Sequence, residues 1–262
     1  MHHAIPTLLL AGAASLAAGA GQAATLVGLT ADNMLLRIDS ETRRAWAPMR
    51  VTGAEGRLLG IDVRPADGKL YGVTTSGQLV TIDPANGRAT QVSRLSEGFE
   101  SGGRAVVDFN PVADRLRLMG MNGWNFRVNV ETGQVTKDGP LKYQAGSPWA
   151  ETMPRVVAGA YINSVAGAQQ TMLYTVDTLT RTLNLQAPPN DGVQQPRGEV
   201  APGLPTGVAF DILADGQGGN SAWLLAGGTL HSVDLQSGRA TPAGAVAGLP
   251  AAAEVIAIAA MR

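Results

Sequence analysis

A short strand–turn–strand unit recurs along this chain, and this recurrence limits the folds that the chain can adopt. Four copies of equal length and a shorter fifth one are LVGLTADNMLLRID from Leu26, LYGVTTSGQLVTID from Leu70, LRLMGMNGWNFRVN from Leu116, LYTVDTLTRTLNLQ from Leu173 and AWLLAGGTLHSVD from Ala222. Apolar runs on both sides of a polar turn are typical of a β-hairpin. Self-similarity at a regular interval indicates a repeat architecture.

More of the unit repeats on both sides of the hairpin. An apolar strand precedes it in LLGIDVRP from Leu58, AVVDFNP from Ala105, VVAGAYIN from Val156 and TGVAFDI from Thr206. A turn and a fourth strand follow it in DPANGRATQV from Asp83, NVETGQVTKD from Asn129 and DLQSGRATPA from Asp234. The Asp or Asn that opens this turn can cap it, and the Gly can supply a positive φ. Four strands per unit of roughly 45 residues are typical of a β-propeller blade.

The two ends of the repeat region predict how the ring closes. The first hairpin, from Leu26, lacks an inner strand, whereas AEVIAIAAMR from Ala253 is an inner strand that lacks a hairpin. We therefore predict one all-β domain over residues 24–262, a five-bladed β-propeller closed by N- and C-terminal strands. A six-bladed ring is the alternative, because the insertion from Lys137 to Pro154 is long enough to hold another strand pair.

The N-terminus predicts a signal peptide over residues 1–23. An Ala- and Gly-rich apolar run extends from Ala4 to Ala20, and Gly21 and Ala23 fit the −3 and −1 positions of a cleavage site. The segment before the apolar run has no Lys or Arg, which leaves a misassigned start or an uncleaved anchor as alternatives. Without a second apolar stretch, we expect a periplasmic or extracellular protein with no membrane span after cleavage.

Composition excludes several classes of site. The chain has no Cys and only three His, and His231 is the one His outside the leader. Disulfides, thiolate metal sites, a cysteine nucleophile and a His-based zinc site are therefore excluded, and a Ser–His–Asp triad is not expected. The formal net charge is −1 and no basic stripe is present, so we expect no nucleic-acid partner.

The third repeat concentrates polar side chains on strands that otherwise look buried. The candidates for a ligand-binding site there are Arg117, Asn122, Asn125, Arg127 and Trp124. In one interpretation the arginines pair internally with Asp108 or Asp138, as buried Arg requires. In the other they line a polar pocket that binds a carboxylate, a phosphate or sugar hydroxyls. We favour internal pairing.

Carboxylates fall at nearly equivalent positions of the predicted inner strands, which line the central channel. They are Asp62, Asp108, Asp211 and Glu254. One interpretation is that each accepts hydrogen bonds from backbone or Arg neighbours. A second is a hard-cation site for calcium, in which Asp62, Asp108 and Asp211 are joined by Asn110 or Asn163. A third is a pair of carboxylates that catalyses hydrolysis of the glycosidase type.

Several segments resemble a bacterial secreted family known as domain of unknown function 4394. They are VDFNPVADRLRLMG, NFRVNVETGQVTKDGPLKY, GAYINSVAGAQQTMLYTVD and LQAPPNDG. The chain departs from the family pattern at Phe126, where an aliphatic residue is usual, and at Ser147–Pro148, where an Asp follows the glycine. The resemblance implies an extracytoplasmic domain of the kind often attached to surface or matrix proteins, and it implies no reaction.

Two functions are compatible with these features. The first is a secreted or periplasmic binding or scaffold module, whose ligand is a small molecule, a carbohydrate or surface polymer, or a surface protein. The alternative is a divalent-cation-dependent or acid–base hydrolase acting in the central channel. A hydrolase needs at least two carboxylates that face one solvent-filled pocket and are free of Arg partners.

Overall fold

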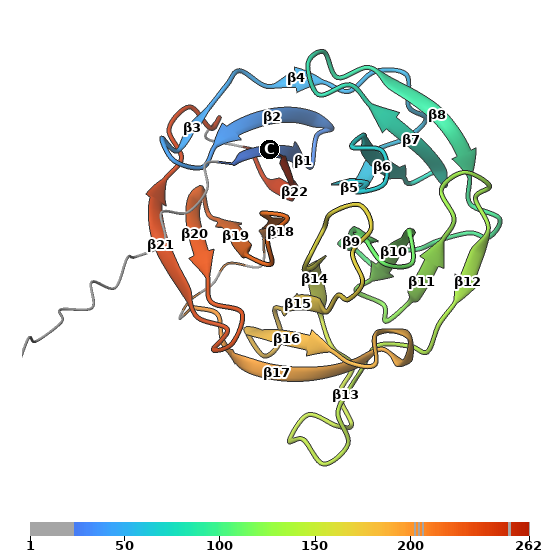
Figure 1. Cartoon of the computed structure of the whole chain (residues 1–262), viewed down its shortest axis with the longest axis vertical. Coiled ribbons are helices and arrows are strands. Elements are labelled where there is room, and N and C mark those ends of the chain that lie inside the picture. The colour runs from blue at the N-terminus through green and yellow to red at the C-terminus, as the bar shows by residue number, and fades with distance from the viewer. Residues whose placement is uncertain (1–23, 202, 204, 206, 251–252, 262) are drawn as a thin grey trace, which may run out of the picture.

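Five small sheets stand around a central axis and form a ring (Figure 1). The computed structural model describes residues 24–261 apart from 202, 204, 206, 251 and 252. The predicted signal peptide, 1–23, lies outside the described residues. We number the sheets as blades 1 to 5 in chain order, and in each blade the strand nearest the axis is the inner strand.

Each blade has four strand positions from the axis outward. Blade 1 consists of β22 (Val255–Met261), β1 (Thr25–Thr30), β2 (Met34–Asp39) and two short outer pieces, β3 (Arg44–Ala45) and β4 (Met49–Arg50). Blade 2 consists of β5 (Leu58–Val63), β6 (Leu70–Thr74), β7 (Gln78–Ile82) and β8 (Ala89–Arg94). Blade 3 consists of β9 (Ala105–Asn110), β10 (Arg115–Gly120), β11 (Asn125–Val128) and β12 (Val135–Lys137).

The remaining two blades follow the same plan. Blade 4 consists of β14 (Val156–Tyr161), β15 (Leu173–Asp177), β16 (Thr182–Gln186) and β17 (Val193–Glu199), with the extra strand β13 (Lys142–Tyr143) beside β17. Blade 5 consists of β18 (Val208–Ala214), β19 (Asn220–Ala226), β20 (Thr229–Val233) and β21 (Ala240–Ala245). Helical structure among the described residues is confined to the 3₁₀ turn η1 (Pro189–Asp191), and none of it is long and apolar enough to cross a membrane.

The ring closes as the sequence predicts. Strand β22, at the end of the chain, pairs antiparallel with β1, so that Thr25 lies opposite Met261 and Val27 opposite Ala259. The two incomplete end segments thus complete blade 1, which confirms the five-bladed propeller closed by its terminal strands. Strand β22 thus covers the edge of β1, which would otherwise be free to pair with another chain.

The six-bladed alternative is wrong. The insertion from Lys137 to Pro154 contributes β13, which runs parallel to β17 at the outer edge of blade 4, with Lys142 opposite Val193. In Figure 1 the segment around β13 extends outward from the ring beside blade 4. The insertion therefore enlarges an existing blade.

Burial on both faces explains the nearly continuous apolar strands. Every residue of β6 and of β14 is buried. Apolar side chains of neighbouring blades share one core at each junction; Tyr71 and Val73 of blade 2, for example, pack with Leu116 and Leu118 of blade 3. A strand buried on both sides has no polar face, so strict alternation is absent.

The turn between the third and fourth strands has the predicted chemistry. Asp83 accepts a hydrogen bond from the N–H of Ala85 at 2.8 Å, and Asp234 accepts one from the N–H of Ser237 at 2.7 Å. The glycine of the turn has a positive φ, 74° at Gly87 and 76° at Gly133. These residues are structural parts of the blade.

Candidate functional site at the propeller axis

Three buried carboxylates converge at the axis. Asp62 lies on β5, Asp108 on β9 and Asp211 on β18, and one carboxylate oxygen from each lies within 4.8 Å of the other two. The three residues are 8%, 3% and 5% exposed. Of the four carboxylates that the sequence places on inner strands, these three converge, whereas Glu254 pairs with Arg104.

The cluster has only three members because two blades carry alanine at the matching position. Asp62, Asp108 and Asp211 stand opposite Tyr71, Arg117 and Trp223 on the second strands of their blades. The matching positions, opposite Tyr174 in blade 4 and Val27 in blade 1, are Ala160 and Ala259. The two alanines belong to blades 4 and 1. Two of the carboxylates therefore come from the neighbouring blades 2 and 3, and the third comes from blade 5, which lies between the two alanine-bearing blades.

The residue that follows this position in each blade donates its backbone N–H to the cluster. Asp62 accepts from Val63 and Phe109, both at 2.7 Å. Asp211 accepts from Ile212 at 2.7 Å and from Ala260 at 2.6 Å.

Asp108 differs from the other two carboxylates. Its Oδ1 accepts from the N–H of Tyr161 at 2.8 Å. Its Oδ2 has no hydrogen-bond partner among the residues that the structure describes. Five of the six carboxylate oxygens thus accept a backbone N–H group, and the sixth, Oδ2 of Asp108, accepts none from the described residues.

Burial and mutual repulsion control the protonation of the cluster. Burial raises the pKa of Asp62 well above its usual range, and the charge of Asp211 raises it further. Burial also raises the pKa of Asp108, to which the charges of Asp62 and Asp211 add. Burial raises the pKa of Asp211 to about 6, against the lowering effect of its two backbone hydrogen bonds. The site therefore favours protons or another cation over three bare negative charges.

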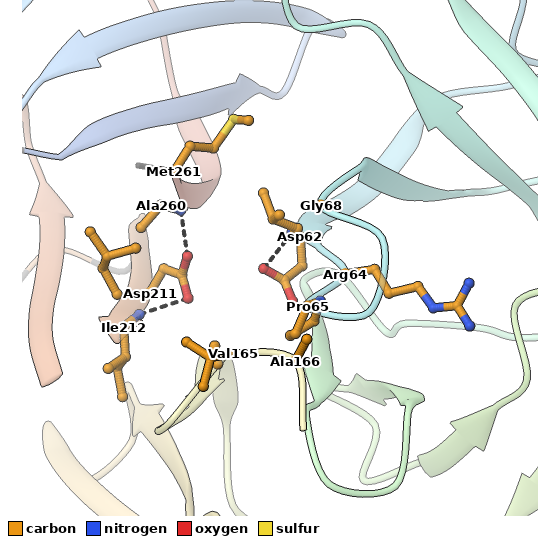
Figure 2. Close-up of a pocket in the computed structure, with 13 residues that line it drawn as sticks. Asp62, Arg64, Pro65, Gly68, Val165, Ala166, Asp211, Ile212, Ala260 and Met261 are labelled. Carbon is orange, nitrogen blue, oxygen red and sulfur yellow. Dashed lines mark hydrogen bonds between the residues drawn. The ribbon is translucent and has the colours of Figure 1, made fainter. Parts of the chain in front are cut away.

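A cavity of about 390 Å³ opens above the carboxylates. Asp62 and Asp211 line it together with the loops at Arg64–Pro65 and Ser164–Ala166 and with the end of β22 at Ala260 and Met261. Figure 2 shows the carboxylates of Asp62 and Asp211 facing each other across this space, while the guanidinium of Arg64 points away. Arg64 instead binds Asp114 at 2.5 Å, so these two carboxylates meet the requirement of a pocket without an Arg partner.

The opposite mouth of the channel carries the positively charged side chain of Arg104. Arg104, which precedes β9, reaches across the axis and donates to the carbonyls of Val208 at 2.7 Å and Ile256 at 2.6 Å. It also pairs with Glu254 at 3.0 Å. Asp108 follows Arg104 by four positions of extended chain, a rise of about 13 Å. Glu254 therefore belongs to the far mouth and not to the carboxylate cluster.

The two amides proposed as extra cation ligands do not join the cluster. Asn110 accepts from the N–H groups of Val112 and Ala113, both at 3.0 Å, and so caps the turn after β9. Asn163 exchanges hydrogen bonds with Asn220 at 2.8 and 3.0 Å.

The arginines of the third repeat are paired internally. Arg117 is 1% exposed and donates to Asp138 at 2.6 Å, Asn125 at 2.9 Å and the hydroxyl of Tyr161 at 3.1 Å. Arg127 contacts both oxygens of Asp138 at 2.8 Å. This network joins blades 3 and 4, and it accounts for the charge on a buried strand as the favoured interpretation predicts.

The other two candidates of the third repeat lie in the turn before β11. Asn122 donates to the carbonyl of Glu100 at 2.6 Å. Trp124 is 38% exposed and stacks on Phe126 with ring centroids 5.3 Å apart. A ligand-binding role for the five candidates stays a prediction.

No sequence pattern singles out Arg104, whose neighbours across the axis come from blades 5 and 1. Its one hint is a position directly before an inner strand, where every blade begins at the same mouth. Tyr161 was also missed, although it joins both networks: its N–H donates to Asp108 and its hydroxyl accepts from Arg117.

Fold and site together define a five-bladed β-propeller with an acidic cavity on its axis. The family model described as "Domain of unknown function (DUF4394)" matches residues 25–259, and the chain belongs to this family. No curated protein matches the chain.

Two solved structures show the extent of similarity to other proteins. The chain is similar to a protein of unknown function from Bacteroides thetaiotaomicron VPI-5482, with 18% identity and a TM-score of 0.48, over 82% of this chain and 56% of that one. It is also similar to a protein of unknown function from Bacteroides caccae, with 12% identity and a TM-score of 0.43, over 84% of this chain and 71% of that one. The chain thus spans little more than half the length of the first of these structures.

Proposed function

We propose that this protein is a binding module that acts outside the cytoplasm and holds a hard divalent cation, calcium first, at the floor of its axial cavity. The observation that carries the proposal is the convergence of Asp62, Asp108 and Asp211 within 4.8 Å without a basic partner in the described residues. Carboxylate oxygens are the ligands that calcium and magnesium prefer. The N-terminal sequence supports the location, because its apolar run ends at a small-residue cleavage pattern.

The cavity above the cluster gives the cation access to a second ligand. A volume of about 390 Å³ fits the usual range for small-ligand sites. A calcium ion takes six to eight oxygen ligands. Three aspartates cannot fill this shell alone, so the open positions face the cavity. Hydroxyl groups of a carbohydrate or surface polymer are the oxygen donors that we expect there.

Calorimetry and thermal unfolding of the metal-free chain test the cation site. A cation that binds only the folded chain at about a hundred times its Kd adds about 2.7 kcal/mol of stability, or roughly 5–10 °C in Tm. The variant Asp211→Asn should lose binding, whereas the matched variant Asp191→Asn, at an exposed residue of η1, should bind as the parent does. No heat and no Tm shift with calcium, magnesium or manganese would overturn the proposal.

One observation favours hydrolysis as a second candidate. Asp62 and Asp211 face the same cavity, and burial raises the pKa of Asp211 to about 6, the range in which a carboxyl can act as an acid at neutral pH. However, both oxygens of each already accept backbone N–H groups. Turnover of a glycan panel that Asp211→Asn abolishes would favour the hydrolase, and calcium-dependent binding without turnover would favour the binding module.

A further inference from the structure

The three axial carboxylates are also the contacts that tie neighbouring blades together at the axis. Asp62 of blade 2 accepts from Phe109 of blade 3, and Asp108 of blade 3 accepts from Tyr161 of blade 4. Asp211 of blade 5 accepts from Ala260 on β22, the strand that closes the ring in blade 1. Three of the five blade junctions therefore depend on side chains of the candidate cation site.

Among the described residues, the other two junctions have no carboxylate contact at the axis. Ala160 and Ala259 occupy the matching positions, and a methyl group accepts no hydrogen bond. The N–H groups that would face them, at Ile212 and Val63, are instead bound by Asp211 and Asp62 of their own blades. These two amides therefore belong to the same ring of five N–H groups, but their hydrogen bonds stay within one blade and do not respond to changes at a junction between blades.

Like charges at this spacing oppose the junction contacts. Two ionised carboxylates a few ångströms apart in a buried site repel each other, and the repulsion separates the inner strands that carry them. The charged residue at the other end of the axis, Arg104, is bound to Glu254 and to two carbonyls and does not offset the repulsion. A cation held between the three carboxylates reverses the force, since it attracts all three.

We propose that a cation in the axial site tightens the propeller, and that Asp211, through Ala260 on β22, couples the occupied site to closure of the ring. This inference rests on the proposed function. It adds that ligand and ring closure are linked: the cation strengthens the three junction contacts, and whatever loosens them weakens cation binding by the same factor. A partner that releases β22 would therefore release the cation.

Amide hydrogen exchange, measured residue by residue by NMR on the purified chain with and without calcium, tests the coupling. Calcium should slow exchange at Phe109, Tyr161 and Ala260 by about tenfold or more relative to Val63 and Ile212. The contrast within one ring of amides separates junction tightening from a general gain in stability.

The variant Asp108→Asn gives an independent measurement. The Oδ1 of the new Asn still accepts from Tyr161, and its Nδ2 replaces the carboxylate oxygen that has no partner in the described part of the chain, so the fold is retained while one charge is removed. With the repulsion relieved, the three junction amides should exchange slowly without calcium, and calcium should no longer change them. Asp191→Asn should behave as the parent does in both measurements.

The outcomes distinguish this inference from the proposed function. Calcium binding by calorimetry with unchanged exchange at the three junction amides would overturn the coupling and leave the cation site in place. No calcium binding at all would overturn the proposed function, and with it the coupling. Slowing that is equal at all five amides would also overturn the coupling, because the junctions would then have no special part.

Discussion

The buried guanidinium of Arg117 explains why one strand of an otherwise apolar sheet can carry charge. Its Nε donates to the hydroxyl of Tyr161, its Nη1 donates to Asn125 and Asp138, and its Nη2 donates to Asn190 at 2.8 Å. Burying such a group is tolerable only when its charge and its N–H groups are all matched. Asp138 supplies the charge for both Arg117 and Arg127, so the network depends on one carboxylate.

We therefore expect Asp138→Asn to be strongly destabilising. The substitution leaves buried Arg117 without a counterion, and loss of one partner from a buried pair costs about 3–5 kcal/mol of unfolding free energy. Urea unfolding measures the loss. The exposed pair of Arg94 and Glu55, at 2.6 Å, provides the control, since Arg94→Ala should cost less than about 1 kcal/mol. Equal losses in the two variants would show that burial adds nothing to the Asp138 network.

At the scale of the strand, the sequence predicts features that depend on local patterns, and it does not predict contacts that depend on long-range geometry. The hairpins and the closing strand follow from apolar periodicity and turn residues within a few positions, so they are visible in sequence. Asp62, Asp108 and Asp211 lie at the same height along the axis because they occupy the same position of the repeat, and this position can be read from the sequence. The crossing of the axis by Arg104 depends on where a long side chain ends, and no local pattern encodes that. The pairing of β13 with β17 is likewise a contact made after the blade has formed.

Gly133, in the turn between the third and fourth strands of blade 3, is needed both for the turn and for the contact with the preceding blade. A Cβ on Gly133 would overlap the carbonyl of Arg94 in the preceding blade, and its φ is 76°. Gly146 has nearly the same φ, 80°, and a Cβ there would meet no other atom within 4 Å. Gly133→Ala should therefore lose about 1–3 kcal/mol more than Gly146→Ala, whose cost of about 1 kcal/mol comes from φ alone. Chemical unfolding of the two variants measures the difference, and equal losses would rule out the steric contribution.

For the whole molecule, the channel is asymmetric in charge. The carboxylates lie toward the mouth with the cavity, and Arg104 with its carbonyl partners crosses the other mouth. A cation or a ligand that reaches the carboxylates therefore enters from the cavity side. Because the carboxylates also tie the blades, the protonation state of the cluster should be visible in the stability of the entire ring.

The metal-free protein should lose stability as pH rises from about 4.5 to 7. The pKa of each of Asp62, Asp108 and Asp211 is raised in the folded state, to about 6 for Asp211, from an ordinary value of 3.8. The folded chain then binds more protons than the unfolded chain, so the stabilising effect is complete below 3.8 and is lost as pH passes through the folded values. Carboxyls whose pKa is lowered in the folded state, such as Asp114 beside Arg64, stabilise the fold throughout this pH range, because their stabilising effect is lost only at lower pH.

Thermal unfolding in chelator across this pH range measures the effect. Tm should fall by roughly 5–10 °C between pH 4.5 and 7. Calcium should flatten the profile, because a bound cation replaces the protons that the carboxylates lose. Asp108→Asn should flatten it without calcium, since two carboxylates repel less than three. A metal-free Tm that stays level or rises over this range would mean that the three carboxylates are stable in ionised form, and the argument for a cation at the axis would lose its electrostatic basis.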